Sequence, residues 1–288
     1  LESALEGQVI SVDDAAEIDL TGESGLVIPG GVTLASGRGV DGSEGALIFS
    51  DELDTMPLFV TGGDGVRVTG LRLRGPDPER RDSAYELPNS RGIETEDNGL
   101  EVDNCELWAW SHAAIYLRRG TGHHVHHSSL HHNQRSGLGY GVCLDVAVAV
   151  IEANLFDWNR HSIAGTGRPE SAYEARYNLV LDNASSHYFD MHGGADREDG
   201  TDIAGELVLV HHNTFLGSDR SAFLIRGVPT DAACAHHNWL ADEDIDYALR
   251  QTNATGSFYV FDNLVGEARA LDEGIADDLI SPSCAGAL

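Results

Sequence analysis

The hexapeptide VHHNTF spans Val210–Phe215, and related hexapeptides follow at Ala235–Leu240 (AHHNWL) and Val260–Val265 (VFDNLV). Each one begins with an apolar residue, has asparagine three positions later, and ends with an apolar residue two positions after that. Looser copies occur upstream, so that the middle position falls at 71, 105, 128, 154, 178, 213, 238 and 263, at intervals of 34, 23, 26, 24, 35, 25 and 25 residues. A period in this range is typical of solenoids, in which each repeat buries its apolar residues against its neighbours.

The pattern of apolar residues inside each repeat indicates the kind of solenoid. Apolar residues alternate in short segments such as 115–117 and 208–210, glycine occurs 33 times, and no long window has helical periodicity. We therefore predict an all-β protein, a right-handed parallel β-helix with coils of about 25 residues. We expect a single domain (1–288), in which 1–65 form N-terminal coils and a cap, 66–266 form the regular coils, and 267–288 form a C-terminal cap or tail.

The charge of the chain limits its partners. The net charge is −29, and all 18 basic residues are arginine, because the sequence contains no lysine. An acidic surface without lysine resembles that of proteins from extreme halophiles. Nucleic acid binding needs a basic face, which is absent here, and no segment approaches the roughly 20 apolar residues that span a bilayer. We expect a monomer that binds neither nucleic acid nor membrane.

The four cysteines bear on the compartment. Cys234 and Cys284 are placed to join the C-terminal tail to the body, which favours an oxidising compartment and a secreted protein. Cys105 replaces the asparagine of the repeat, so we expect a buried free thiol there. No two cysteines have the spacing of zinc ligands.

The most conspicuous polar residues belong to the repeat. The histidine-rich run 123–132 (HHVHHSSLHH) resembles a metal site, but histidine pairs also precede the middle position at 211–212 and 236–237. They are therefore interpreted as part of the repeated turn. The asparagines at the middle positions are expected to hydrogen-bond the turn backbone from coil to coil.

A second strand of each coil orders the remaining polar residues. Its inward residues are predicted to be Ile93, Ile115, Val142, Ile163, Phe189, Phe223 and Ala248. Residues one and three positions later then face outward, and adjacent coils lie about 4.8 Å apart. This alignment places Asp190 and His192 on one face, with Thr166 and Arg226 on either side of His192. The long loops 76–91 and 194–205 interrupt the period and are expected to form the walls of a groove.

The segment 187–192 (HYFDMH) resembles the aromatic-Gly-Phe-Asp-Pro-His motif of mannuronan C5-epimerases, which share the parallel β-helix fold with alginate and pectate lyases. The resemblance implies that Asp190 and His192 correspond to the catalytic aspartate and histidine of that family. Three positions differ: a methionine replaces the proline, Tyr188 replaces the glycine, and His187 stands where a catalytic tyrosine is expected. The lysine of the family has no counterpart in this chain.

Chemistry on a uronic acid explains why such residues would be needed. Removal of the C5 proton requires that the sugar carboxylate first be neutralised, so that the developing charge is stabilised. Arginine does this with a two-pronged hydrogen bond, and Arg226 and Arg118 are candidates. His192 or His187 is the candidate base, because histidine titrates near neutral pH.

A second group must deliver a proton, either to O4 in a lyase or to the opposite face of C5 in an epimerase. Tyr188, Tyr140 and His161 are candidates for this role. Tyr140, His161 and His187 occupy equivalent positions in neighbouring coils, so they are expected to stack and to line a subsite or bind a metal. The substrate-binding candidates are His161, Tyr140, Arg118, Asp145, Thr166 and Arg160.

We therefore predict a secreted enzyme that acts on an acidic, uronate-containing polysaccharide by C5 proton abstraction, with β-elimination favoured over epimerisation. One alternative is an inverting glycoside hydrolase, in which Asp145 and Asp190, two coils and about 9.6 Å apart, would form the carboxylate pair. The Asp-Asp and Gly-His-Gly features of β-helix polygalacturonases are missing, however, and the other interpretation of Asp145 is an ion pair with Arg118 in the adjacent coil. The other alternative is a non-catalytic carbohydrate-binding or structural solenoid. No cofactor is required, although Ca²⁺ stays open as a means of neutralising the uronate.

Overall fold

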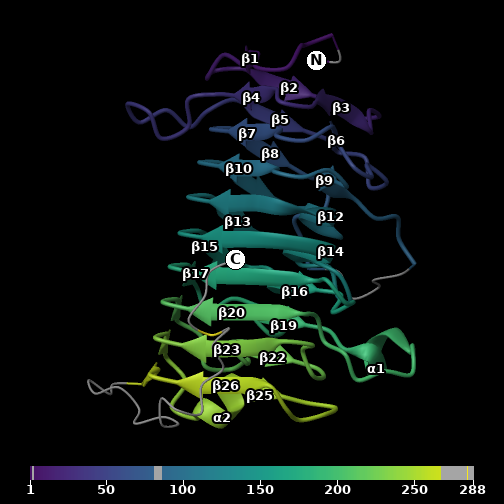
Figure 1. Cartoon of the computed structure of the whole chain (residues 1–288). Coiled ribbons are helices and arrows are strands. Elements are labelled where there is room, and N and C mark those ends of the chain that lie inside the picture. Colours follow the sequence, from purple (N-terminus) through teal and green to yellow (C-terminus); the bar gives the residue numbers. More distant parts are fainter. Residues whose placement is uncertain (2, 81–85, 267–283, 285–288) are drawn as a thin grey trace.

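The chain folds into a stack of coils, which Figure 1 shows as one column of parallel arrows. The computed structural model describes residues 1, 3–80, 86–266 and 284. Each regular coil contributes one strand to each of three parallel sheets, and strands of successive coils pair in register. The predicted parallel β-helix is therefore confirmed. Of the segment 267–288, only Cys284 lies among the described residues.

Three columns of paired strands, called sheets below, run the length of the stack. The long strands β12 and β14 extend through the first two columns and join them into one 17-stranded sheet, and the third column is a separate 10-stranded sheet. The site sheet, named for the candidate site that it carries, consists of β3 (Leu26–Pro29), β6 (Phe59–Gly62), β9 (Arg91–Thr95), the first halves of β12 (Ala113–His126) and β14 (Tyr140–Glu152), β16 (His161–Gly165), β19 (Phe189–Met191), β22 (Phe223–Ile225) and β25 (Leu249–Gln251). The second sheet consists of β1 (Val9–Ser11), β4 (Thr33–Ala35), β7 (Arg67–Thr69), β10 (Glu101–Asp103), the second halves of β12 and β14, β17 (Ala172–Arg176), β20 (Leu207–His211), β23 (Ala232–His236) and β26 (Phe258–Phe261). The third sheet consists of β2 (Glu17–Asp19), β5 (Leu47–Phe49), β8 (Arg72–Arg74), β11 (Glu106–Trp108), β13 (Ser129–His131), β15 (Leu155–Asp157), β18 (Leu179–Val180), β21 (Thr214–Phe215), β24 (Trp239–Leu240) and β27 (Leu264–Val265).

Two helices of one turn each, α1 (Gly194–Arg197) and α2 (Ile245–Ala248), interrupt the coils. Neither helix in the described part of the chain has the length and apolar character needed to cross a bilayer.

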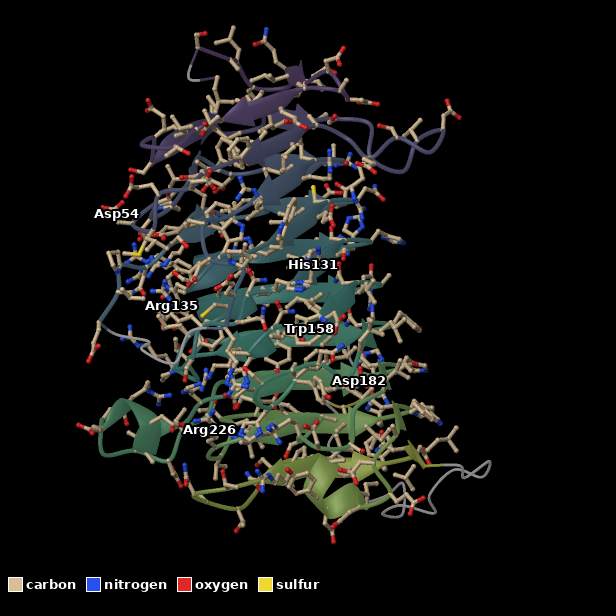
Figure 2. All side chains as sticks on the ribbon, turned by 180° about the vertical axis from the view of Figure 1, so that it is seen from behind. Asp54, His131, Arg135, Trp158, Asp182 and Arg226 are labelled. Atoms are coloured by element: carbon tan, nitrogen blue, oxygen red, sulfur yellow. A yellow bond between two sulfur atoms is a disulfide. The ribbon has the colours of Figure 1, made fainter. Side chains whose placement is uncertain are left out.

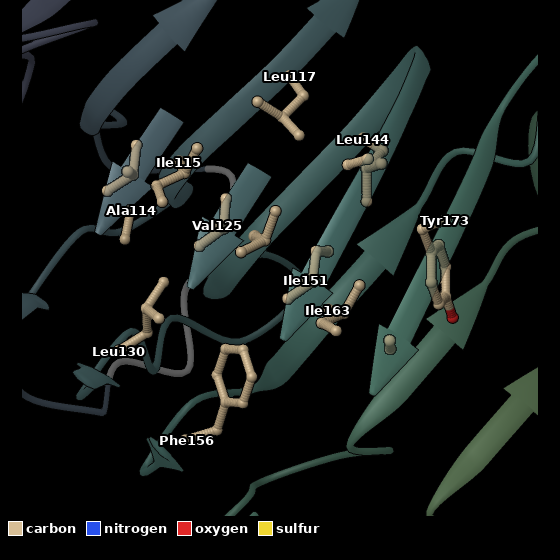
Figure 3. Close-up of a cluster of buried hydrophobic side chains, with 14 of the residues drawn as sticks. Ala114, Ile115, Leu117, Val125, Leu130, Leu144, Ile151, Phe156, Ile163 and Tyr173 are labelled. Atoms are coloured by element: carbon tan, nitrogen blue, oxygen red, sulfur yellow. The ribbon is translucent and has the colours of Figure 1, made fainter. Parts of the chain in front are cut away.

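Aliphatic side chains from all three sheets fill the interior of the stack. In Figure 3, Ile115 and Ile163 of the site sheet face Val125 of the second sheet and Phe156 of the third sheet, and all four side chains are fully buried. Identical positions in successive coils therefore pack on one another, which is why the repeat pattern is apolar at the same places in each coil.

The asparagine ladder forms the turn between the second and third sheets, as predicted. The side chain of Asn178 donates to the Ile151 carbonyl oxygen at 2.9 Å and to Asn213 Oδ1 at 2.9 Å, and it accepts from the Asn154 backbone at 3.0 Å. The residue before each asparagine has a left-handed backbone, with φ of 55° at His212. The histidine pairs lie on this turn.

The cysteine predictions are confirmed. Cys234 and Cys284 form a disulfide, and Cys105 is a buried free thiol.

The predicted register of the last coil is wrong by one residue. We expected Ala248 to pair with Phe223, but Leu249 does so. The reason is the short helix α2, which is capped by the Asp244 side chain and takes up Ala248, so that β25 begins one residue later. Consequently Arg250, and not Leu249, pairs with the outward residue Leu224.

Candidate functional site

The centre of the candidate site is Asp190, in the middle of β19. It pairs with Ala164 of β16 and Leu224 of β22, so it stands in the outward column as predicted. Its side chain is nevertheless fully buried. Arg226 forms a two-pronged ion pair with it, with Nε 3.1 Å from Oδ1 and Nη2 2.5 Å from Oδ2. Figure 2 shows Arg226 beside the projecting segment that contains α1.

His192 lies between two carboxylates. Its Nε2 is 3.1 Å from Asp190 Oδ2, and its Nδ1 is 3.8 Å from Asp196 Oδ2 in α1. The third nitrogen of Arg226, Nη1, donates to Asp196 Oδ1 at 3.2 Å. The predicted grouping of Asp190, His192 and Arg226 is therefore present, but Arg226 directs all three of its nitrogens at protein carboxylates.

Gly193 allows the chain to leave the strand at this point. A Cβ atom at Gly193 would lie 1.7 Å from the carbonyl oxygen of Arg226, so no other residue fits without moving the backbone of the next coil. Its backbone N–H donates to Asp196 Oδ2 at 3.1 Å, which fixes α1 and turns the Asp196 carboxylate back over His192.

The charge states within the site follow from these contacts. Burial by itself would raise the pKa of Asp190, but the hydrogen bond from His192 and the charge of Arg226 hold it below the usual value for aspartate. An ionised carboxylate can only accept hydrogen bonds, so the ring proton of neutral His192 lies on Nε2. The lone pair of His192 is then on Nδ1, toward Asp196.

His161 stands behind this pair. Its ring is fully buried, and burial lowers the pKa of His161 to about 3, so it is neutral at pH 7. Its Nδ1 is 2.5 Å from the His187 carbonyl oxygen and must donate to it, which leaves a lone pair on Nε2. That Nε2 is 3.5 Å from Asp190 Oδ2 and has no hydrogen-bond partner among the described residues.

The predicted stack of Tyr140, His161 and His187 forms. The ring centroids of Tyr140 and His161 are 5.8 Å apart with an interplanar angle of 8°, and those of His161 and His187 are 5.7 Å apart at 23°. Partial burial lowers the pKa of His187 to about 4.

A cavity of about 180 Å³ opens in front of His192. This volume is below the roughly 300 Å³ at which sites for whole small-molecule ligands begin, so it suits one part of an extended ligand. Small and aromatic residues of the site sheet form its floor, and the α1 segment forms one wall. Its lining residues are His112, Tyr116, Tyr140, Cys143, Ala164, Gly165, Thr166, His192, Asp196 and Arg197.

The structure separates Tyr188 from the site. Its side chain is fully buried in the hydrophobic core and packs on Phe215, with ring centroids 6.2 Å apart. Its phenol oxygen lies next to Gly217, where an added Cβ would be 1.5 Å away. Tyr188 precedes the first residue of β19, so the alternation of the strand does not apply to it. Its expected role as proton carrier at this site is therefore wrong.

The other substrate-binding candidates are scattered. Arg118 pairs with Glu94 at 3.2 Å and also with Glu96, so the expected pair with Asp145 is replaced. Asp145 instead accepts from the Thr166 hydroxyl at 2.7 Å.

Arg160 does not line the cavity but lies over the Tyr140 ring, with its guanidinium carbon 5.9 Å from the centroid. Of the predicted residues, Tyr140, Thr166 and His192 do line it.

Sequence reasoning missed seven of the ten lining residues, of which four are aromatic or charged. Asp196 and Arg197 lie in the loop 194–205, which was predicted to form a wall but not to supply functional groups. Arg197 donates from Nε to Asp199 Oδ2 at 2.8 Å, from Nη1 to the Thr166 carbonyl oxygen at 2.8 Å and from Nη2 to the Ile203 carbonyl oxygen at 2.9 Å, so each of its nitrogens also has a protein partner. The other two are His112 and Tyr116 of the β12 coil, three coils from His192, and they differ in no obvious way from other polar residues of the repeat.

Comparison with known proteins gives structural likeness without sequence likeness. No protein-family model matches the sequence, and no curated protein matches it significantly. Among solved structures, the family 28 exopolygalacturonase of Yersinia enterocolitica is 10% identical, with a TM-score of 0.57 over 92% of this chain and 61% of its own. DFA-IIIase from Arthrobacter chlorophenolicus A6, solved in complex with GF2, is 14% identical, with a TM-score of 0.53 over 94% of this chain and 76% of its own.

At these identities the likeness defines the fold, a right-handed parallel β-helix, in agreement with the prediction. The chain spans about three fifths of the length of the exopolygalacturonase. The A-module of a mannuronan C-5 epimerase from Azotobacter vinelandii has 13% identity and a TM-score of 0.43 over 94% of this chain and 88% of its own, a value that supports no conclusion.

Proposed function

We propose that this protein is a secreted enzyme that acts on an acidic, uronate-containing polysaccharide and cleaves it by β-elimination after abstraction of the C5 proton. The observation that carries the proposal is the setting of His192. One ring nitrogen is held by the buried, ionised Asp190, and the other carries a lone pair at the edge of a cavity with a partly aromatic lining.

The reaction assigns one step to each group. His192 Nδ1 accepts the C5 proton, and Asp190 and Asp196 stabilise the imidazolium that forms. Arg197 lines the cavity, and each of its Nη nitrogens has a second N–H beyond the one that bonds Thr166 or Ile203; with these it stabilises the negative charge that develops on the sugar carboxylate. The C4–O4 bond then breaks, O4 takes a proton from the Tyr140 hydroxyl, and an unsaturated uronate remains.

Arg226 has a different role from the one that the sequence suggested. Its contacts to Asp190 and Asp196 make it a positioning residue, which fixes both carboxylates around the His192 ring. In this proposal Arg197, and not Arg226, contacts the sugar carboxylate.

The hydrolase alternative is less well supported by the same geometry. An inverting hydrolase needs two carboxyl groups that reach the sugar and a water between them. Asp190 is fully buried and paired with Arg226, so it does not reach a ligand in the cavity. Epimerisation shares the first step with elimination but returns a proton to the opposite face of C5 instead of protonating O4. The products of the two reactions differ, so product analysis distinguishes them.

The test is an assay in high salt with alginate, pectate and glycosaminoglycans as separate substrates. We expect ultraviolet absorbance from unsaturated uronate with at least one polymer, and loss of this signal in His192→Gln, by roughly the 10²–10⁴-fold typical of a lost general base. The matched control is His237→Ala, which removes an exposed histidine of the repeated turn. New reducing ends without ultraviolet absorbance would refute elimination, and a changed epimer ratio by NMR without chain cleavage would indicate an epimerase.

The disulfide between Cys234 and Cys284 supports the proposed secretion, because such bonds persist in oxidising compartments. The net charge of −29 without lysine supports salt adaptation, which is the reason for assaying in high salt.

A further inference from the structure

The geometry points to a binding site for a divalent transition metal of the zinc type, formed by His161, Asp190 and His192. His161 belongs to β16 and Asp190 to the neighbouring strand β19, and His192 is the residue that follows β19. One ligand atom of each lies within 4.8 Å of the other two. Nothing in the proposed elimination uses His161, so this site goes beyond the proposed function.

The separations of the donor atoms suit such an ion. Zinc binds histidine nitrogen at about 2.0–2.1 Å and carboxylate oxygen at about 2.0–2.2 Å, so tetrahedral ligands stand roughly 3.4 Å apart. Asp190 Oδ2 lies 3.5 Å from His161 Nε2 and 3.1 Å from His192 Nε2. The third pair, between the two histidine nitrogens, lies within 4.8 Å, and the His192 side chain, at 24% exposure, is the least buried of the three.

The independent observation is the state of His161. The Nε2 atom of this fully buried imidazole has no hydrogen-bond partner among the described residues and lies 3.5 Å from a carboxylate oxygen of Asp190. Two such donor atoms 3.5 Å apart and without a hydrogen bond between them are both satisfied by one metal ion that lies between them. The other nitrogen of His161 donates to the His187 carbonyl oxygen, which is the usual way in which the tautomer of a metal-binding histidine is fixed.

Arg226 leaves room for the ion. A carboxylate offers about four lone-pair sites, and Arg226 uses one on each oxygen of Asp190. Ligating carboxylates are commonly hydrogen-bonded in this way. Together Asp190, Asp196 and Arg226 carry one net negative charge, which attracts a divalent cation.

The donor set selects the metal. Two imidazoles and one carboxylate suit zinc and its neighbours, and three protein ligands leave a coordination position open toward the cavity. Calcium prefers six to eight oxygen ligands, so it does not suit these groups. The sequence had left Ca²⁺ open, but these residues favour a different class of ion.

Occupation of this site excludes the base role of His192. The metal takes the Nε2 lone pair, and the single ring proton then resides on Nδ1, where the proposed reaction needs a lone pair. This consequence rests on the proposed function, whereas metal binding rests on the geometry alone. Zinc is therefore expected to inhibit elimination reversibly.

The experiment titrates the full chain, stripped with a chelator, with Zn²⁺ in competition with a chromophoric chelator, and with Co²⁺ followed by visible absorbance. We expect one tightly bound ion per chain. In His161→Ala the affinity should fall more than about 100-fold, beyond the effect of losing an outer partner. The matched control His237→Ala should bind as the unmodified protein does, because it removes only a surface histidine.

Three results would overturn the site: no binding by the unmodified protein, equal affinity in His161→Ala, or loss of binding in His237→Ala. If thermal unfolding shows that His161→Ala is not folded, His192→Gln gives the same comparison. Elimination activity is measured in a separate assay, with and without bound zinc. Zinc that binds at this site without slowing elimination would leave the metal site in place and remove His192 from the base role.

Discussion

Replacement of Arg226 by methionine tests the electrostatic core of the site. Arg226→Met keeps much of the side-chain volume but leaves Asp190 ionised, fully buried and without its two-pronged partner. Removing one member of a buried ion pair costs about 3–5 kcal/mol, mainly because the remaining charge is uncompensated. We expect a loss of this size in the free energy of unfolding, measured by urea denaturation. Arg220→Met is the matched control, because Arg220 pairs with Asp219 on the surface and should cost no more than about 1 kcal/mol.

A double-mutant cycle identifies the cause. If uncompensated charge at Asp190 dominates, Asp190→Asn in the Arg226→Met background should cost much less than it does alone. The double variant should then be at least about 2 kcal/mol more stable than the sum of the single effects predicts, within the range of couplings between residues in direct contact. Additive effects would refute the assignment of Arg226 as the group that compensates Asp190.

The loss of stability in Arg226→Met should depend on pH. The contacts of Asp190 lower its pKa in the folded protein below the unfolded value of about 3.9. This group therefore adds stability that is present above about pH 4 and is lost as the pH falls through the folded pKa. Without Arg226 the pKa rises, so the stability gap between Arg226→Met and the unmodified protein should narrow as the pH is lowered from 7 toward 4. A gap that is constant with pH would contradict the role given to this ion pair.

Three further predictions concern the stability of the solenoid and the position of Tyr188, which the sequence motif placed in the site. Asn178→Ala removes the side-chain partner of the Ile151 carbonyl oxygen and of the Asn154 N–H, whereas Asn213 Oδ1 keeps the backbone N–H of residue 178. Two unpaired groups at about 1–3 kcal/mol each should cost at least about 2 kcal/mol in urea denaturation, whereas the less buried Asn183→Ala should cost about 0.5 kcal/mol or less. Tyr188→Phe should retain full elimination activity and an equal or higher free energy of unfolding, because the buried Tyr188 hydroxyl has no hydrogen-bond partner among the described residues. A large loss of elimination rate in this variant would show that Tyr188 belongs to the active site. Replacing both Cys234 and Cys284 by serine should lower the unfolding free energy by up to about 4 kcal/mol, the chain-entropy value for a separation of 50 residues, and no change in denaturation would exclude a stabilising bond.

The repeat made the fold and much of the site predictable. Asn178 and Asn213 mark equivalent positions in successive coils, so alignment of the second strand followed from counting residues. That alignment brought Asp190 and Arg226 together although they are 36 residues apart. Alternation works here because identical positions of adjacent coils lie one strand spacing apart.

Prediction failed where the backbone leaves the regular strand. Tyr188 and Ala248 both lie just before a strand begins, and neither follows its alternation. The burial of Asp190 also could not be deduced, because an outward position in a strand is exposed only if nothing covers it. The covering group, Asp196 with Arg226, depends on a turn after Gly193 that requires the close approach of two backbones.

The site lies where the repeat is broken, and this has a physical reason. The interval from Asn178 to Asn213 is 35 residues, against 25 in each of the two intervals that follow. Since each coil contacts only its neighbours, ten extra residues leave the rest of the stack unaffected, and lengthening a loop costs only about 0.6 kcal/mol per doubling. The extra residues form the α1 segment, which places Asp196 against Arg226 and His192. On a regular coil Asp190, Arg226 and His192 would lack these contacts, and it is the insertion that adds a second carboxylate beside Arg226 and His192 and supplies a wall of the cavity.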